Sequence, residues 1–418
     1  MSRGSMIVAG VMSGTSADGI NVALVRIANP VQSFPGEANQ VADRHERRLQ
    51  AIELLGHAEH PYPSRIRAAV LAAMNAPRAS VADLARLNFL LGELYAGAVL
   101  ASERRFGVKV DLVGCHGQTL YHQGDRRPFL GHRIAATWQT GEGGLVAARV
   151  GVPAVSDFRP ADMAAGGKGA PLVPFLDYLW FRDNNVGRIV QNIGGIANLT
   201  AIPPRANAKD VLAFDTGPGN MVIDAVTSKL FGKPFDRGGR IAASGKVMET
   251  VISQILRRAF FRAKPPKTAG REEFGREFVR QFLGSCGRAR KQDLVATATA
   301  LTARSIADAV KRFVAKIPTS ASTVKKWGTH RDRASRFGEL IVSGGGAKNA
   351  TLVAMLTEYL APMGICVRFS DEFGLPSDAK EAVAFAVLAY ETWHRRASNV
   401  PSATGAERAA VLGKISYA

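Results

Sequence analysis

In each half of the chain, an apolar segment that reads as a strand runs into a short glycine-containing turn with an aspartate. The turn 13–19 carries Asp18, and the turn 215–220 carries Asp215. Small residues in such turns leave backbone groups and the carboxylate accessible at one edge of a sheet. Because strand patterns elsewhere in the chain alternate with helical ones, we expect an α/β fold in two lobes.

Hydrophobic spacing places the main elements along the sequence. Residues 6–12 and 20–27 alternate like the two strands of a hairpin. Residues 81–105 carry a helical apolar stripe and follow Ser80, a typical N-cap residue. Apolar runs and helical patterns predict further strands and a last helix, at 108–114, 188–193, 340–342 and 379–396.

The length of 418 residues fits two domains. We expect the first lobe to comprise residues 1–156 together with about 380–418, and the second lobe to comprise residues 157–379. Residues 318–337 are rich in Pro, Ser, Thr, Lys and Arg, and we predict a mobile insertion there.

Composition excludes several classes of protein. The three cysteines are widely spaced, which argues against a disulfide scaffold and a cysteine metal site. We find no run of the ~20 apolar residues that a membrane span needs, and we expect a soluble, cytoplasmic protein without a membrane partner. The net charge of +19 lies largely in 257–291 and 311–336. These segments lack the aromatic interleaving of an RNA-binding surface, so we expect a solvated basic face and no nucleic-acid partner.

The turn 13–19 contains three hydroxyl side chains and small residues between two strands. Backbone N–H groups in such a turn can approach phosphate oxygens, and Asp18 can hold a water of a hydrated Mg²⁺. The turn is not a Walker A motif, because no Gly-Lys-Ser/Thr closes it. An ordinary hairpin turn is the alternative interpretation.

The other two turns suit a nucleotide enzyme as well. Asp215 follows an apolar strand and precedes a glycine turn, where it can act as a base; a helix N-cap is the alternative. The run 343–347 after the strand 340–342 is almost free of side chains, so it can lie against an adenine or a ribose. A tight turn alone explains that run equally well.

The whole set of motifs resembles the anhydro-N-acetylmuramic acid kinase family. The matching segments follow the family's order and span about 6–396, namely 10–19, 116–119, 157–159, 165–174, 192–198, 214–220, 266–272 and 343–347. The resemblance implies a two-lobed actin/hexokinase/Hsp70-type ATPase (ribonuclease H-like) fold with the active site in the cleft between the lobes. It also implies ATP and Mg²⁺, and lobes that close over the nucleotide about hinges near 157–171 and 370–381.

The reaction implied by the resemblance is the opening of the 1,6-anhydro bridge of 1,6-anhydro-N-acetylmuramic acid by water, with phosphorylation of O6. The product is N-acetylmuramic acid 6-phosphate, and the pathway is peptidoglycan recycling. By motif match, Asp215 is the catalytic base and Glu381 a supporting acidic group. A homodimer is left open.

The other site residues fall into two groups. We expect the nucleotide to contact these three turns, the glycine pair that follows the strand 188–193, and the start of the second strand. The residues are Gly14, Thr15, Ser16, Ala17, Asp18, Gly19, Ile20, Asn21, Gly194, Gly195, Gly217, Gly344, Gly345 and Gly346. We expect the sugar to contact Ser13, His116, Thr119 and Arg159. A structural histidine at His116 and an internal ion pair at Arg159 are the alternatives.

Three departures from the family pattern define the rival hypotheses. Asn21 stands where the family usually has Asp, Lys168 where it has Gln, and 138–143 replaces Gln-Ile-Gly-Asn/Asp-Pro. Lys168 and Glu142 raise the alternative of a same-fold kinase for another amino sugar. Asn21 and the net charge raise the alternative of a weakly active nucleotide-binding or nucleic-acid-associated protein.

Overall fold

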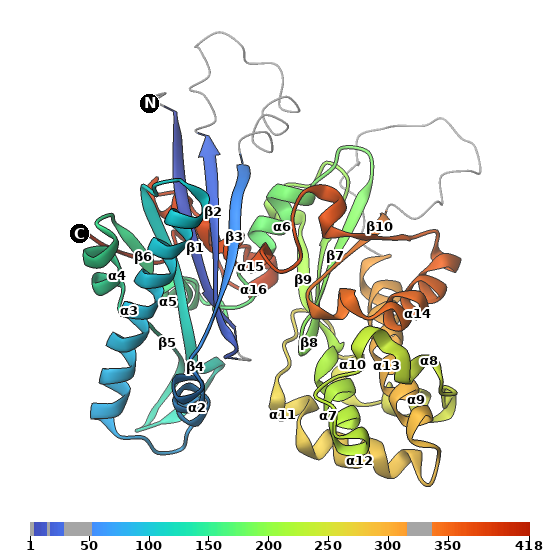
Figure 1. The fold of residues 1–418 in the computed structure, drawn as a ribbon. Coiled ribbons are helices and arrows are strands. Elements are labelled where there is room, and N and C mark those ends of the chain that lie inside the picture. The colour runs from blue at the N-terminus through green and yellow to red at the C-terminus, as the bar shows by residue number, and fades with distance from the viewer. Residues whose placement is uncertain (1–3, 15–16, 29–51, 316–336) are drawn as a thin grey trace, which may run out of the picture. The chain divides into compact units, whose positions relative to one another are not determined.

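The computed structural model describes residues 4–14, 17–28, 52–315 and 337–418. The chain divides into two compact units, which are unit 1 (1–180 and 379–418) and unit 2 (181–378) (Figure 1). The boundary expected after residue 156 is wrong, because it lies between Trp180 and Phe181. The insertion predicted at 318–337 lies outside the described residues, except for Phe337.

The sheet of unit 1 has the strand order β12-β6-β4-β1-β2-β3, and β5 pairs with β4. β1, β2 and β3 form an antiparallel meander, whereas β4 lies parallel to β1 and to β6. The strands are β1 Ser5–Ser13, β2 Gly19–Ala28, β3 Ile52–Pro61, β4 Leu112–Phe129, β5 His132–Thr140, β6 Ala154–Ser156 and β12 Lys414–Ser416. The predicted hairpin is therefore confirmed.

The sheet of unit 2 repeats this topology. Its order is β11-β10-β7-β8-β9, in which an antiparallel meander of β7, β8 and β9 is followed by two parallel strands. The strands are β7 Gly187–Ile193, β8 Ile196–Ile202, β9 Leu212–Pro218, β10 Phe337–Ser343 and β11 Cys366–Phe369. The same three-plus-two arrangement in both units confirms the predicted duplicated α/β architecture.

Helices pack on both sheets (Figure 1). Unit 1 contains α2 Ser64–Ala73, α3 Val81–Phe106, α4 Gly143–Val150, α5 Phe158–Ala164, α15 Lys380–Trp393 and α16 Pro401–Thr404. It also contains α6 Pro174–Phe181 except for the last residue, Phe181, which is the first residue of unit 2. Unit 2 contains α7 Asn220–Phe231, α8 Arg240–Ala243, α9 Glu249–Ile255, α10 Ala259–Arg262, α11 Arg271–Phe274, α12 Arg276–Cys286, α13 Lys291–Ala309 and α14 Ala350–Leu360. Ser80 caps α3 as predicted, because its side chain accepts a hydrogen bond from the Asp83 amide.

Contacts of the buried Asp162 explain why residues 157–180 belong to unit 1. Its Oδ1 accepts hydrogen bonds from Asn399 Nδ2 at 2.8 Å and Thr404 Oγ1 at 2.7 Å. Its Oδ2 accepts one from the Gly169 amide at 2.8 Å. These bonds tie the glycine-rich loop after α5 to the C-terminal segment. The hinge expected at 157–171 thus lies inside unit 1, whereas the one expected at 370–381 includes the boundary at Asp378.

Helix α15 lies directly on the sheet of unit 1, because two strand glycines leave room for its backbone. A Cβ atom at Gly10 of β1 would lie 1.8 Å from the carbonyl oxygen of Ala382. A Cβ atom at Gly114 of β4 would lie 2.2 Å from the carbonyl oxygen of Phe385. This close approach fixes the first turn of α15, which carries Glu381.

The substitution Gly10→Ala is expected to lower the free energy of unfolding by about 1–3 kcal/mol, since the methyl group forces α15 off the sheet. Urea denaturation measures the change. Gly97→Ala is the matched control: Gly97 is an exposed glycine of α3 with nothing within 4 Å of an added Cβ. The free energy of unfolding of this control should be higher than that of wild type by up to about 1 kcal/mol, because alanine has a higher helix propensity than glycine. Equal stability of Gly10→Ala and wild type would contradict the packing argument.

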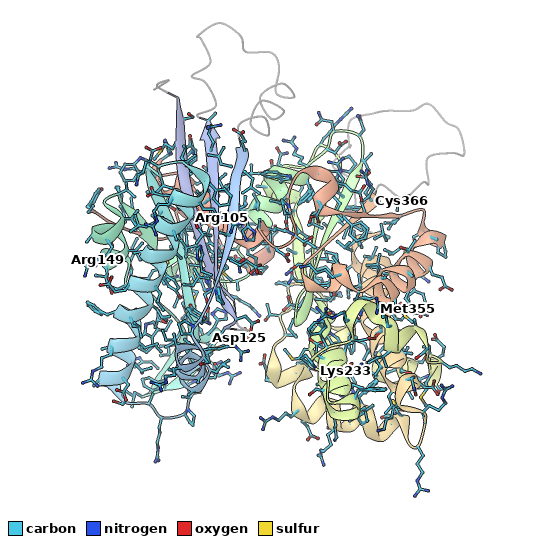
Figure 2. The ribbon with its side chains drawn as sticks, viewed as in Figure 1. Arg105, Asp125, Arg149, Lys233, Met355 and Cys366 are labelled. Atoms are coloured by element: carbon cyan, nitrogen blue, oxygen red, sulfur yellow. The ribbon has the colours of Figure 1, made fainter. Side chains whose placement is uncertain are left out.

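One helix qualifies the expectation that no segment could span a membrane. Among the described residues, α3 is long and apolar enough to do so by length and composition alone. Its buried face, with Leu87, Leu91 and Val99, belongs to the core of unit 1, as in the core helices of globular proteins. Charged side chains such as Arg149 and Lys233 are exposed (Figure 2).

Candidate active site

In unit 2, Asp215 lies on β9 and is held by the segment 267–269. Its amide donates to the carbonyl oxygen of Lys267 at 3.0 Å, and its Oδ2 accepts from the Ala269 amide at 2.7 Å. Burial raises the pKa of Asp215 to about 7, although the Ala269 hydrogen bond and the Lys267 charge act in the opposite direction. The carboxylate can therefore accept a proton near neutral pH. The alternative of an N-cap is wrong, because Gly219 caps α7 without a side-chain bond.

Three glycine turns meet at one edge of the unit 2 sheet, where the parallel strands β7, β9 and β10 end. The amides of Gly219 and Asn220 donate to the carbonyl oxygens of Gly195 at 2.9 Å and Gly194 at 2.7 Å. The turn after β10 lies against the same place, since a Cβ atom at Gly345 would be 3.4 Å from Asn220 Nδ2. The structure thus brings together Gly194, Gly195, Gly217, Gly344, Gly345 and Gly346, the predicted nucleotide contacts of this unit.

In unit 1, a buried hydroxyl network fixes the start of the turn after β1. Ser13 Oγ donates to Gln118 Oε1 at 2.7 Å and accepts from the Tyr62 hydroxyl at 3.0 Å. Gln118 Nε2 donates to the Gly14 carbonyl oxygen at 3.2 Å. Ser13 is 2% exposed, so the structure gives it a role in shaping the turn. Its predicted contact with the sugar stays a prediction.

The remainder of the first turn is only partly described. Thr15 and Ser16 lie outside the described residues. Ala17 and Ile20 are buried, so their side chains fill the core of unit 1. Asn21 lies on β2, where its Oδ1 is 3.0 Å from His57 Nε2.

Asp18 is the residue that the sequence predicts for magnesium, and this role stays a prediction. Its exposed carboxylate pairs with Arg67 at 2.9 Å. No group of three or more His, Cys, Asp or Glu side chains in the described part of the chain could enclose a metal ion. Mg²⁺ needs no such group, because it keeps several waters and takes one or two carboxylates plus substrate phosphates. A single carboxylate beside a turn that is predicted to bind phosphate suits that coordination.

His116, which is buried on β4, contacts Arg159 in the first turn of α5. Arg159 Nε and Nη2 lie 3.2 and 3.0 Å from His116 Nε2, and Nη1 donates to the Gly169 carbonyl oxygen at 3.0 Å. Since guanidinium can only donate, His116 Nε2 accepts and its Nδ1–H points to the Gly117 carbonyl oxygen at 2.8 Å. Burial, with the Arg159 charge, lowers the pKa of His116 to about 3. The structure thus supports a neutral, structural histidine.

Glu381 and Thr119 lie in the same unit. Burial raises the pKa of Glu381, whereas the charges of Lys380 and Arg159 act in the opposite direction. Thr119 Oγ1 accepts a hydrogen bond from Gln139 Nε2 at 3.2 Å. Arg159 makes its hydrogen bonds to His116 and Gly169, so the direct ion pair that sequence reasoning left open is not among its contacts in the described residues.

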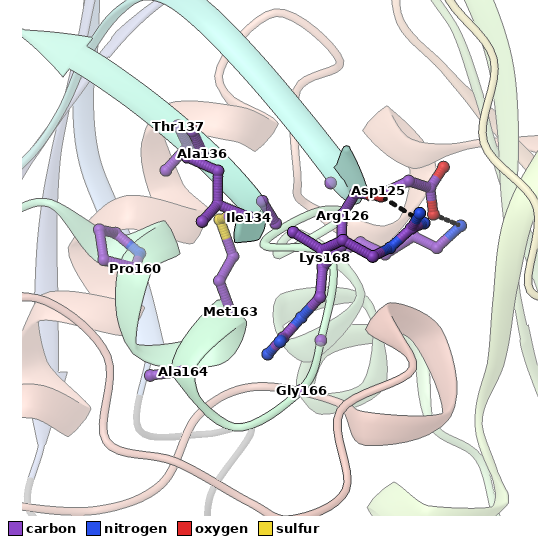
Figure 3. A pocket seen from close by; sticks show the side chains of 14 residues that line it. Asp125, Arg126, Ile134, Ala136, Thr137, Pro160, Met163, Ala164, Gly166 and Lys168 are labelled. Atoms are coloured by element: carbon purple, nitrogen blue, oxygen red, sulfur yellow. Dashed lines mark hydrogen bonds and ion pairs between the residues drawn. The ribbon is translucent and has the colours of Figure 1, made fainter. Parts of the chain in front are cut away.

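Lys168 lies beside a pocket of about 660 Å³ between the β4–β5 hairpin and the glycine-rich loop (Figure 3). Met163 of α5 and Ala136 of β5 both line this pocket. Lys168 Nζ pairs with Asp125 at 3.0 Å. The cation that stands where the family usually has Gln therefore has a carboxylate partner in this structure.

Several residues of the site were missed in the sequence. Gln118 could have been identified from the sequence, because it belongs to the motif 116–119. Tyr62 and Tyr95, whose hydroxyls are 3.1 Å apart, carried no local signal. Lys267 lies in a matched motif, but nothing in its spacing indicates contact with Asp215.

Comparisons with known proteins agree with the motif pattern. A family model described as anhydro-N-acetylmuramic acid kinase matches residues 6–418. Proteins of that name from Bacillus cereus and Bacillus thuringiensis subsp. konkukian are each 40% identical over 415 residues, covering 99% of this chain and of the relative. Among solved structures, a ROK hexokinase from Thermus thermophilus aligns with 92% of this chain and 99% of its own at 14% identity. The TM-score of this alignment is 0.38.

Proposed function

Because the chain belongs to the anhydro-N-acetylmuramic acid kinase family, we infer that it is an ATP-dependent kinase of 1,6-anhydro-N-acetylmuramic acid in peptidoglycan recycling. The observation that carries this conclusion is the match over nearly the whole chain at 40% identity. We further propose that water opens the anhydro ring while O6 takes the phosphoryl group. The need for ATP makes a cytoplasmic location part of the proposal.

Asp215 is the proposed general base. Its carboxylate takes a proton from water, and the water oxygen forms a bond to C1 as the C1–O6 bond breaks. O6 then attacks the γ-phosphorus of ATP, and ADP leaves with the electrons of the broken phosphoanhydride bond. The raised pKa of Asp215, about 7, supports this role, because a base works best when its pKa lies near the working pH.

The glycine turns are the proposed nucleotide contacts. In unit 2, the turns at this edge contain Gly194, Gly195 and Gly345, which are not buried and carry no side chain. In unit 1, the turn around Gly14 and Asp18 is proposed for phosphate and hydrated Mg²⁺. When bound, Mg²⁺ neutralises negative charge on the phosphates.

Glu381 and Arg159 are the proposed sugar-binding groups of unit 1. Arg159 has two of its donors on His116, a neutral acceptor, which leaves its positive charge available to the lactyl carboxylate or the transferred phosphoryl group. The Arg159 charge also acts on Glu381: burial raises the pKa of Glu381, whereas the Arg159 charge lowers it.

Sugar-dependent release of ADP tests the proposed function. The expected result is rapid ADP formation with 1,6-anhydro-N-acetylmuramic acid and little with N-acetylmuramic acid, N-acetylglucosamine or 1,6-anhydro-N-acetylglucosamine. Preference for another sugar of the panel would favour the rival amino-sugar kinase. No turnover with any sugar would favour a weakly active nucleotide-binding protein.

Asp18→Ala is expected to weaken Mg²⁺-dependent ATP use more than sugar binding, because it removes the described carboxylate of the first turn. The KM for ATP should rise and the Mg²⁺ requirement should increase, as steady-state kinetics at several Mg²⁺ concentrations would show. Asp83→Ala, an exposed aspartate paired with Arg86 on α3, is the control and should change neither value. Equal losses of ATP and sugar affinity by calorimetry would mean that Asp18 only shapes the turn.

A further inference from the structure

The side chain of Lys267 is buried in unit 2 among aromatic rings. Its Nζ lies 4.6 Å from the ring centroid of Phe260, 5.2 Å from that of Phe313 and 5.8 Å from that of Phe214. It donates a hydrogen bond to the Phe260 carbonyl oxygen at 3.0 Å. Lys267 is 7% exposed and has no part in the ion pairs formed among the described residues. A lysine is seldom buried without a carboxylate partner, so this arrangement calls for a reason.

The backbone that this side chain anchors contacts the proposed base on two sides. The Lys267 carbonyl oxygen accepts from the Asp215 amide, and the Ala269 amide donates to Asp215 Oδ2. Within the described residues, the hydrogen bonds of the carboxylate go to Oδ2, which leaves Oδ1 to receive a proton. The position of residues 267–269 therefore decides which way the carboxylate points.

We propose that Lys267 is a positioning residue for Asp215: its ammonium is enclosed by three phenylalanine rings and anchors the segment whose Ala269 amide orients the carboxylate. The positive charge of the same ammonium acts on that carboxylate as well. The inference rests on the proposed function, in which Asp215 is the general base. Cation–π contact with several rings stabilises a desolvated ammonium and so makes the anchor rigid.

The charges around Lys267 and Asp215 indicate that Lys267 also acts on Asp215 electrostatically. The Lys267 charge lowers the pKa of Asp215 against burial, whereas Glu272 raises it. Burial lowers the pKa of Lys267 to about 8, with the Arg312 charge in the same direction and Asp215 opposed. Asp308 and Arg312 line the small cavity beside Lys267 and Thr216.

The test compares Lys267→Gln, which keeps a hydrogen-bond donor but removes the charge, with Lys267→Arg, which keeps the charge. For Lys267→Gln, the acid limb of the kcat–pH profile should move up by about one pH unit. The turnover below that limb should fall about tenfold, with the KM for ATP unchanged. Lys267→Arg should retain the wild-type acid limb. Lys233→Gln, at an exposed lysine of unit 2, is the control.

A readout that needs no substrate separates this inference from the proposed function. Carbon-13 NMR of aspartate-labelled protein, assigned with Asp215→Asn, follows the titration of Asp215 directly. A higher Asp215 pKa in Lys267→Gln than in wild type supports the inference even if the sugar proves to be a different one. An unchanged pKa together with an unchanged profile overturns it. If Lys267→Gln does not fold, a shifted acid limb in Lys267→Arg overturns it as well.

Discussion

Asp215→Asn is expected to reduce turnover by about 10²–10⁴-fold while the affinity for ATP stays close to wild type. The amide keeps an oxygen that can accept from the Ala269 amide, so the turn should retain its geometry. It cannot take a proton from water. Steady-state kinetics and ATP titration by calorimetry measure the two effects separately.

Stability provides an internal control for this variant. The pKa of Asp215 is raised from 3.8 to about 7 in the folded protein. The folded state therefore binds more protons than the unfolded state between these values, and stability falls as the pH rises through them. Because Asn does not titrate, Asp215→Asn should have a higher Tm than wild type at about pH 8, above both pKa values. Lower stability would mean that lost activity reflects damage to the fold.

Asp224 offers a matched control in the same unit. Burial, with the charge of Asp236, raises its pKa to about 6. Its place on α7 is outside the glycine turns, so Asp224→Asn should leave turnover unchanged. Wild-type turnover in Asp215→Asn, or an equal loss in both variants, would contradict the assignment of the base.

Lys380→Met is expected to lower the free energy of unfolding by about 3–5 kcal/mol, because it removes the counter-charge of the buried Asp177 carboxylate. Lys380 Nζ lies 2.8 Å from Asp177 Oδ1, and both side chains are almost fully buried, at 3% and 5% exposed. The pair joins α6 to the first turn of α15, next to Glu381. Denaturant unfolding followed by circular dichroism measures the loss.

Two further variants serve as controls for the stability of Lys380→Met. The double variant Lys380→Met, Asp177→Leu removes both charges and should recover most of the loss, as for other buried ion pairs replaced by apolar residues. Arg280→Met breaks the exposed pair with Glu277 on α12 and should leave the free energy of unfolding nearly unchanged. If Lys380→Met alone is as stable as Arg280→Met, the ion pair between Lys380 and Asp177 does not hold α15 in place.

Local patterns predicted the elements of this fold well. The alternation in 6–12 and 20–27 predicted the β1–β2 hairpin, and Ser80 predicted the start of α3. The glycine turns were also predictable, because strand ends followed by small residues determine their own backbone. These signals come from residues that are neighbours in the chain.

Long-range contacts were not predictable in the same way. The boundary between the units depends on Asp162, whose partners Asn399 and Thr404 are more than two hundred residues away. The glycine content of the loop after α5 indicated a hinge. However, Asp162 joins that loop to the C-terminal segment through its hydrogen bonds with Gly169, Asn399 and Thr404. The environment of Asp215 likewise depends on Lys267 and Ala269, which no periodicity connects to β9.

The most direct test of the account is the mass of the product formed from ATP, Mg²⁺ and 1,6-anhydro-N-acetylmuramic acid. The account predicts a product heavier than the sugar by one water and one phosphoryl group, with one ADP for each molecule of product. A product heavier by a phosphoryl group alone would contradict ring opening by water. The absence of any product, in a protein that still binds ATP, would contradict the kinase itself.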